Sequence, residues 1–170
     1  MKRLNQKQYH LFAFITAGLL TIGSFYFQYI VGLAPCALCI IQRGLMIALL
    51  VLFFRGIFTQ ISQQRLLNII IFITAILGVF VAGRQTYLQY WAPADVISCG
   101  PSLSFVWNYL SWTESLMYLF NGAGSCSEVQ WQLMGISMPA WVLLFFLGFA
   151  VLAFINFIRL SRKTHITLAE

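Results

Sequence analysis

Charged residues are scarce in this 170-residue chain. They make up 8% of it, acidic residues number four, 61% of residues are hydrophobic, and the mean hydropathy is +0.85. A soluble globular domain carries about 25% charged residues. The composition therefore excludes an ordinary soluble domain and predicts an integral membrane protein.

Long apolar stretches account for most of the chain. A helix needs about 20 mostly apolar residues to cross a bilayer. Four stretches qualify, at about residues 11–33, 35–54, 66–88 and 139–158. The length leaves no room for a second domain, so we expect residues 1–170 to form one all-α, four-transmembrane-helix bundle. A short polar turn is expected between Phe53 and Arg65, and the first helix is expected to be retained because it is too long for a signal peptide.

Basic residues gather at three places along the chain. They lie before the first span, between the second and third spans, and after the last: Lys2, Arg3, Lys7, Arg55, Arg65, Arg159, Arg162 and Lys163. By the positive-inside rule these places are cytoplasmic, which puts both termini inside and the long connection of about residues 89–138 outside. The basic residues form no separate patch, so we expect no nucleic-acid partner despite the net charge of +6.

No cysteine falls on the expected cytoplasmic side. All four lie at or beyond the outer face, and these are Cys36, Cys39, Cys99 and Cys126. In a bacterial cell that face is the periplasm, where disulfides persist. The two histidines, His10 and His165, lie on the opposite side and are poor candidates for chemistry there. A tetra-cysteine metal site is the competing use, but only the first cysteine pair has CxxC spacing, so we expect no metal.

The segment Pro35–Arg43 combines a dithiol with a cation. On a helix, Cys36, Cys39 and Arg43 would share one face. Pro35 suits the first turn of a helix, so the helix is expected to begin close to Cys36. A helix N-terminus and a nearby guanidinium both favour the reactive thiolate form. The alternative is that both cysteines are small buried side chains or form an inert disulfide.

The long outer connection holds the second cysteine pair. Pro93 and Pro101 flank Cys99, and a glycine-rich turn precedes Cys126, so this pair is expected on flexible backbone. Residues 103–120 are too polar to span a membrane and too apolar to stay in water. They are expected to form a short interfacial helix or a loop packed on the bundle. One rigid and one flexible dithiol on the same side suggest a relay of disulfide exchange.

Three stretches of the sequence resemble the disulfide bond formation protein B (DsbB) family of the bacterial inner membrane. They are Gly32–Arg43, Leu88–Gln89 before Cys99, and Cys126–Trp131 continuing to Gly135–Trp141. The resemblance covers nearly the whole chain and includes cysteine order and loop lengths. It implies a four-helix bundle with a membrane-associated helix in the second outer loop. It also implies a thiol:quinone oxidoreductase that reoxidises the periplasmic thioredoxin-fold oxidase DsbA.

The resemblance also implies a role for each site residue. Cys99 would form the mixed disulfide with a DsbA-like partner, and Cys126 would then attack Cys36. Cys39, as thiolate, would contact the quinone, which is ubiquinone or menaquinone, and Arg43 would stabilise that charge and hold the quinone. The implied partners are therefore the DsbA-like protein, the membrane quinone pool and the lipid bilayer.

Two departures from the family pattern bear on the quinone site. Gln42 stands where some members carry an acid, and no histidine lies near the end of the third span, where some members have one. The contribution of such a histidine to the quinone site must be absent here or supplied by Arg84 or Gln85. Arg84 also suits a snorkelling interfacial position.

Three other functions stay open from the sequence. The chain could be a paralogue with a dedicated partner, a quinone enzyme of the vitamin K epoxide reductase type, or a non-catalytic membrane scaffold with structural disulfides. Turnover with a reduced thioredoxin-fold protein and quinone separates an enzyme from the scaffold, whose disulfides would persist.

Overall fold

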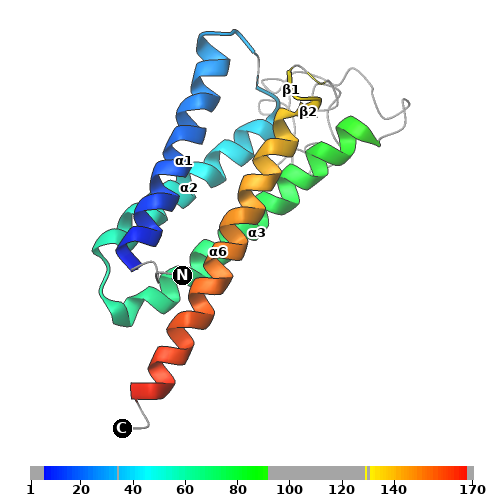
Figure 1. Cartoon of the computed structure of the whole chain (residues 1–170). Coiled ribbons are helices and arrows are strands. Elements are labelled where there is room, and N and C mark those ends of the chain that lie inside the picture. Colours follow the sequence, from blue (N-terminus) through cyan, green and yellow to red (C-terminus); the bar gives the residue numbers. More distant parts are fainter. Residues whose placement is uncertain (1–5, 34, 92–128, 130, 168–170) are drawn as a thin grey trace, which may run out of the picture.

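Four long helices run up and down in the part of the chain that the structure, a computed structural model, describes: residues 6–33, 35–91, 129 and 131–167 (Figure 1). They are α1 (Gln6–Tyr29), α2 (Ala37–Phe58), α3 (Ile61–Tyr90) and α6 (Met138–Thr167). A short hairpin of β1 (Gln132–Leu133) and β2 (Ile136–Ser137) precedes α6. Each helix is long and apolar enough to cross a membrane. The predicted all-α, four-helix membrane fold is confirmed, whereas the predicted interfacial helix at 103–120 lies outside the described residues.

The helix ends follow local sequence signals. Beyond the end of α1, Gly32 has a φ of +78°, a conformation that glycine adopts without strain. At the start of α2, Cys36 is the N-cap, so Pro35 precedes the helix rather than occupying its first turn as expected. The helix does begin close to Cys36, because the cysteine sulfur accepts a backbone N–H as a capping side chain does. Between α2 and α3 the expected polar turn is only Thr59 and Gln60 long.

Small side chains allow the helices to approach closely in the core. Fully buried alanines lie on three helices, and these are Ala13, Ala17, Ala75, Ala82 and Ala153. Larger residues fill the space between them, including Leu49, Phe53, Ile71 and Phe146. Many large apolar side chains instead face outward, as expected where the surrounding medium is lipid. The most extensive packing joins α3 to α6, and α1 and α3 each pack on α2.

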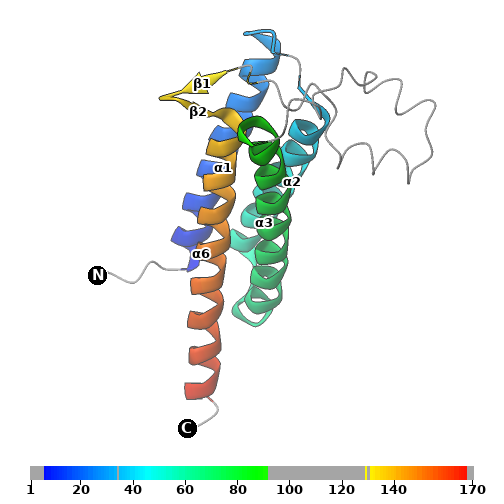
Figure 2. The same cartoon turned by 90° about the vertical axis from the view of Figure 1, so that its right-hand side faces the viewer.

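A buried polar network joins the helices near the start of α1. His10 Nε2 of α1 lies 2.8 Å from Gln64 Oε1 of α3, and Gln64 Nε2 donates to the Gly56 carbonyl of α2 at 3.0 Å. Asn156 of α6 donates to Asn68 Oδ1 of α3 at 2.9 Å. The start of α1 and the C-terminal end of α6 lie at the same end of the molecule, opposite the hairpin (Figure 2). The CxxC pair is therefore far from this network.

Candidate functional site

The two cysteines of the CxxC segment lie together at the head of α2. The Sγ atoms of Cys36 and Cys39 are 2.8 Å apart, so the two residues are in contact but not joined by a disulfide. The backbone N–H of Cys39 donates to Cys36 Sγ at 3.3 Å. A disulfide bond is about 2.05 Å long, so a small side-chain movement would join the two sulfurs. The helix head thus holds a dithiol ready for reversible oxidation.

Two buried glutamine side chains from neighbouring helices meet at this dithiol. Gln85 Nε2 of α3 lies 3.3 Å from Cys36 Sγ and 3.1 Å from Cys39 Sγ. Gln42 of α2, one turn from the cysteines, donates from Nε2 to Gln85 Oε1 at 2.6 Å. The Gln42 contact leaves the amide nitrogen of Gln85 facing the sulfurs.

Arg43 is bound to α1 by its guanidinium group. Its Nε donates to Ser24 Oγ at 2.7 Å, Nη2 donates to the Ser24 carbonyl at 3.3 Å, and Nη1 donates to Gln28 Oε1. The Cζ atom also lies 4.7 Å from the centre of the Phe25 ring, which adds a cation–π contact. No Asp or Glu lies in the part of the chain that the structure describes. These partners are all uncharged, so the positive charge at this position is not neutralised by them.

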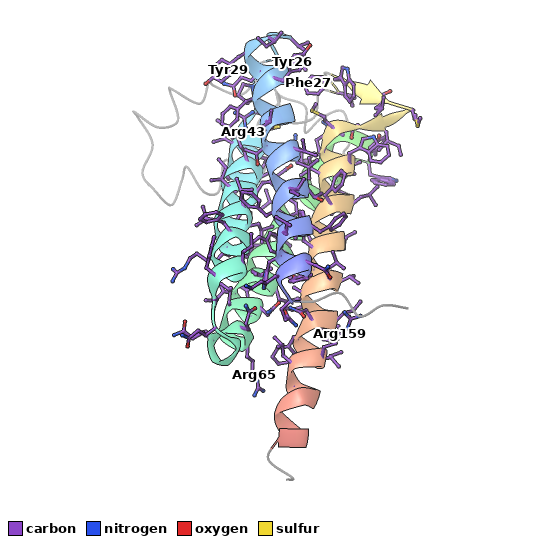
Figure 3. The ribbon with its side chains drawn as sticks, turned by 60° about the vertical axis from the view of Figure 1, so that its left-hand side comes forward. Tyr26, Phe27, Tyr29, Arg43, Arg65 and Arg159 are labelled. Carbon is purple, nitrogen blue, oxygen red and sulfur yellow. The ribbon has the colours of Figure 1, made fainter. Side chains whose placement is uncertain are left out.

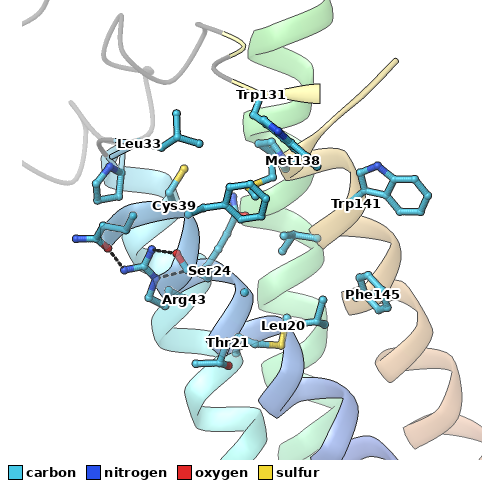
Figure 4. A pocket seen from close by; sticks show the side chains of 18 of the residues that line it. Leu20, Thr21, Ser24, Leu33, Cys39, Arg43, Trp131, Met138, Trp141 and Phe145 are labelled. Carbon is cyan, nitrogen blue, oxygen red and sulfur yellow. Dashed lines mark hydrogen bonds between the residues drawn. The ribbon is translucent and has the colours of Figure 1, made fainter. Parts of the chain in front are cut away.

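A cavity of about 490 Å³ opens beside the dithiol (Figure 4). Both Cys39 and Arg43 contribute to its wall, together with Gln42 and Gln85. The rest of the lining is mostly apolar and comes largely from α1 and α6, for example Leu20, Met138, Val142 and Phe145. Small-molecule sites typically have volumes of about 300–1,000 Å³ and combine apolar walls with a few polar groups. This cavity has those properties.

The hairpin brings an aromatic side chain to the outer end of the cavity. Its two turn residues, Met134 and Gly135, have φ values of 55° and 77°, as a two-residue type I′ turn requires. Tyr90 of α3 fixes the hairpin, because its hydroxyl accepts the Ser137 N–H at 2.9 Å. The ring of Trp131, just before β1, lies 4.8 Å from that of Phe27 on α1, centre to centre. Both rings line the cavity.

The predicted site residues fall into two groups in the structure. Cys36, Cys39 and Arg43 all line one cavity, and the roles predicted for them stay predictions. Cys99 and Cys126 lie outside the described residues. Arg84 is not among the lining residues, and its guanidinium lies over Tyr87 at 5.7 Å.

Sequence reasoning missed the contact between Gln85 and the sulfurs. It named Gln85 only as a possible contributor to the quinone site, although an amide inside an apolar span is itself a signal of a buried polar contact. It also missed the hairpin, because the turn pair Met134-Gly135 lacks the Asn or Asp that usually marks such a turn.

Comparisons with known proteins agree on one family. The family described as "Disulfide bond formation protein DsbB" matches residues 6–156. Disulfide bond formation protein B of Marinobacter nauticus is 35% identical over 149 residues, covering 85% of this chain and 87% of the relative. Disulfide bond formation protein B 2 of Pseudomonas fluorescens is 35% identical over 153 residues, covering 87% and 82%. The protein of that name from Methylococcus capsulatus is 31% identical over 154 residues, covering 89% and 94%.

The match extends across the CxxC segment, all the cavity-lining residues, α1, α2, α3 and the first part of α6 as far as Asn156. A membrane-spanning bundle with a dithiol at one helix head is consistent with the activity that the family name states. The chain therefore belongs to the DsbB family of multi-pass membrane disulfide oxidoreductases, which act in protein disulfide bond formation.

Proposed function

We propose that this protein is a thiol:quinone oxidoreductase that reoxidises a DsbA-like thioredoxin-fold protein and passes the electrons to membrane quinone. The observation that carries the proposal is the cavity at the head of α2, whose wall contains both the Cys39 thiol and the Arg43 guanidinium. A thiol and a cation in one cavity suit an electron acceptor whose oxygen atoms gain negative charge as it is reduced.

The residues of the cavity fit a quinone. Leu20 of α1 and Val142 and Phe145 of α6 provide apolar surface for a flat ring. Arg43 provides hydrogen-bond donors for a ring carbonyl at the same end as Cys39. Because the lining comes from helices that also face the bilayer, a lipid-soluble acceptor such as ubiquinone or menaquinone suits the site better than a water-soluble one.

The proposed relay consists of two disulfide exchanges and one oxidation. The dithiol of the partner reduces the Cys99–Cys126 disulfide through a mixed disulfide at Cys99. The resulting dithiol reduces the Cys36–Cys39 disulfide, beginning with attack of Cys126 on Cys36. The Cys36–Cys39 dithiol would return to the disulfide by giving two electrons and two protons to a bound quinone, which would supply the oxidising power. Each exchange forms one disulfide as it consumes another, so thiols and disulfides balance until this last step.

The redox potentials explain why such a relay needs an acceptor outside the protein. DsbA is a strong oxidant with a potential of about −120 mV, and 30 mV corresponds to about 1.4 kcal/mol for a two-electron couple. A protein disulfide whose couple has a lower potential does not oxidise the DsbA dithiol favourably unless a stronger acceptor then removes the electrons. In this proposal the membrane quinone pool removes them.

The charge distribution supports an orientation with the dithiol at the periplasmic face of the bacterial inner membrane. Arg65 and Arg159 lie toward the end of the bundle away from Arg43 (Figure 3). With that basic end in the cytoplasm, both termini are cytoplasmic, and the head of α2 and the hairpin face the oxidising periplasm.

Steady-state turnover tests the proposed function. Purified protein in detergent is mixed with a reduced DsbA-like partner and a soluble ubiquinone or menaquinone analogue, and the loss of quinone absorbance is followed. We expect catalytic loss with the unmodified chain and none with Cys39→Ser or Cys99→Ser, with a reaction lacking the partner as the blank. No turnover by the unmodified chain with either quinone would contradict the proposal and favour a scaffold with structural disulfides.

A further inference from the structure

The Gln85 amide faces both sulfurs of the dithiol at once. Its nitrogen is 3.3 Å from Cys36 Sγ and 3.1 Å from Cys39 Sγ, while the sulfurs themselves are only 2.8 Å apart. The nitrogen and the two sulfurs therefore form a nearly equilateral triangle. The amide NH2 group is within hydrogen-bond distance of both sulfurs in one position of the side chain.

The Gln42 side chain determines which end of that amide faces the cysteines. Its Nε2 group donates to Gln85 Oε1 at 2.6 Å, which holds the oxygen away from the sulfurs and the nitrogen toward them. The reverse orientation would place a carbonyl oxygen against a thiolate, and the two would repel each other. Only 5% of Gln42 and 2% of Gln85 are exposed, so water competes little for either amide.

Arg43 is less suited to this task than the amide. Its guanidinium donates to Ser24 and Gln28 of α1, whereas Gln85 donates directly to the sulfurs. The cation therefore acts on the dithiol from a distance, through its charge and through the cavity that it lines.

We propose that Gln85 is a catalytic hydrogen-bond donor to the Cys36–Cys39 pair, and that Gln42 is a positioning residue that keeps the Gln85 N–H directed at the sulfurs. The inference rests on the proposed function, in which this pair cycles between dithiol and disulfide. When the Cys126 thiolate attacks Cys36 Sγ, a Cys36–Cys126 bond forms, the Cys36–Cys39 bond breaks, and the electron pair remains on Cys39 Sγ. The Gln85 N–H already faces that sulfur and stabilises the charge as it appears.

The proposal makes the redox equilibrium of the pair depend on Gln85. A thiolate is a much stronger hydrogen-bond acceptor than a disulfide sulfur, so the donor stabilises the reduced state. Removing the donor should favour the disulfide by about tenfold in the equilibrium constant, or about 30 mV for this two-electron couple.

The test uses the full chain with Cys99→Ser and Cys126→Ser, so that only one cysteine pair remains. The protein is equilibrated at neutral pH with mixtures of reduced and oxidised dithiothreitol, and the fraction of disulfide is measured by mass after alkylation. Gln85→Met keeps the length of the side chain without its N–H, and Gln85→Asn keeps a buried amide that is one methylene shorter. We expect both to shift the equilibrium toward the disulfide.

A matched variant separates this effect from a loss of stability. Gln64 is an equally buried glutamine on the same helix, at the far end of the bundle from the cysteines. We expect Gln64→Met to leave the equilibrium unchanged. A shift of the same size in Gln64→Met, or no shift in either Gln85 variant, would overturn the role of Gln85.

The role of Gln42 has its own test in the same assay. We expect Gln42→Met to produce a smaller shift toward the disulfide, and no further shift when Gln85→Met is already present. Additive shifts in the double variant would overturn the positioning role. These outcomes leave the proposed function standing, whereas a Cys36–Cys39 pair that forms no reducible disulfide at any ratio would contradict the proposed function itself.

Discussion

At the scale of single residues, Arg43 combines a fixed position with a positive charge that its hydrogen-bond partners leave unneutralised. Ser24, Gln28 and Phe25 hold its guanidinium from the α1 side, while the residue also lines the cavity. An arginine inside a membrane helix costs about 2.5–3.5 kcal/mol at the bilayer centre and less toward its surface. A ligand oxygen in the cavity would offset part of this cost, because it would provide the charged group with a further acceptor.

Replacement of Arg43 should weaken quinone binding more than it affects exchange with the partner. Hydrogen bonds to charged groups contribute about 1.5–3 kcal/mol. We therefore expect Arg43→Ala to raise the KM for quinone by about tenfold or more. Arg43→Lys should recover part of the loss, because lysine retains the charge but not the planar set of donors. The measurement is steady-state turnover at varied quinone with saturating partner.

The control for Arg43 is the same assay with the concentration of the reduced DsbA-like protein varied at saturating quinone. The KM for the reduced DsbA-like protein should stay near its original value in Arg43→Ala, because the proposed contact with the partner is at Cys99. An unchanged KM for quinone would contradict the role proposed for Arg43.

At the scale of helices, close packing and buried hydrogen bonds hold the bundle together in different places. Gly78 of α3 lies against the ring of Phe146 of α6, and the Phe146 side chain is fully buried. A methyl group added at Gly78 would overlap that ring. At the end away from the cysteines, Gln64, Asn68 and Asn156 join helices through side-chain hydrogen bonds. The cavity lies at the opposite end, between parts of α1 and α6.

A substitution at Gly78 should reveal how much the α3–α6 contact contributes to stability. Overpacking of a core typically costs about 1–3 kcal/mol. We expect Gly78→Ala to lower the midpoint of thermal unfolding in detergent, followed by the loss of helical circular dichroism. Gly148→Ala, on α6, is the matched control, because a methyl group there would meet no atom within 4 Å. Equal midpoints for the two variants would contradict this expectation and show that α3 and α6 accommodate the added methyl group at Gly78 without loss of stability.

At the scale of the whole molecule, the redox chemistry and the polar network occupy opposite ends of one bundle. The dithiol, both glutamines and Arg43 lie near the hairpin, and the network around His10 and Gln64 lies near the start of α1. Two electron-transfer sites are needed in the proposed relay, one for a protein in the periplasm and one for a quinone in the membrane. The head of α2 is suited to connect them, because its two cysteines line the apolar cavity together with Leu133 of the hairpin.

Much of this arrangement could be predicted from the sequence because the signals were local. Apolar runs predicted the four helices, and helical spacing predicted that Cys39 and Arg43 lie on one face of α2, where both now line the cavity. The contact of Gln85 with the sulfurs could not be predicted, since it depends on the relative rotation of α2 and α3, which helical spacing within one segment does not define. The attachment of Arg43 to Ser24 depends in the same way on how α1 packs against α2.

The most direct test of the central claim is a single-turnover titration of quinone with the Cys36–Cys39 pair alone. The full chain with Cys99→Ser and Cys126→Ser is reduced, freed of reductant and mixed with quinone, and both quinone absorbance and free thiols are measured. We expect one quinone to be reduced for each pair of thiols lost, and no reduction when Cys39→Ser is added. If the thiols persist and the quinone stays unreduced, the result would contradict electron transfer from this dithiol to a quinone in the cavity.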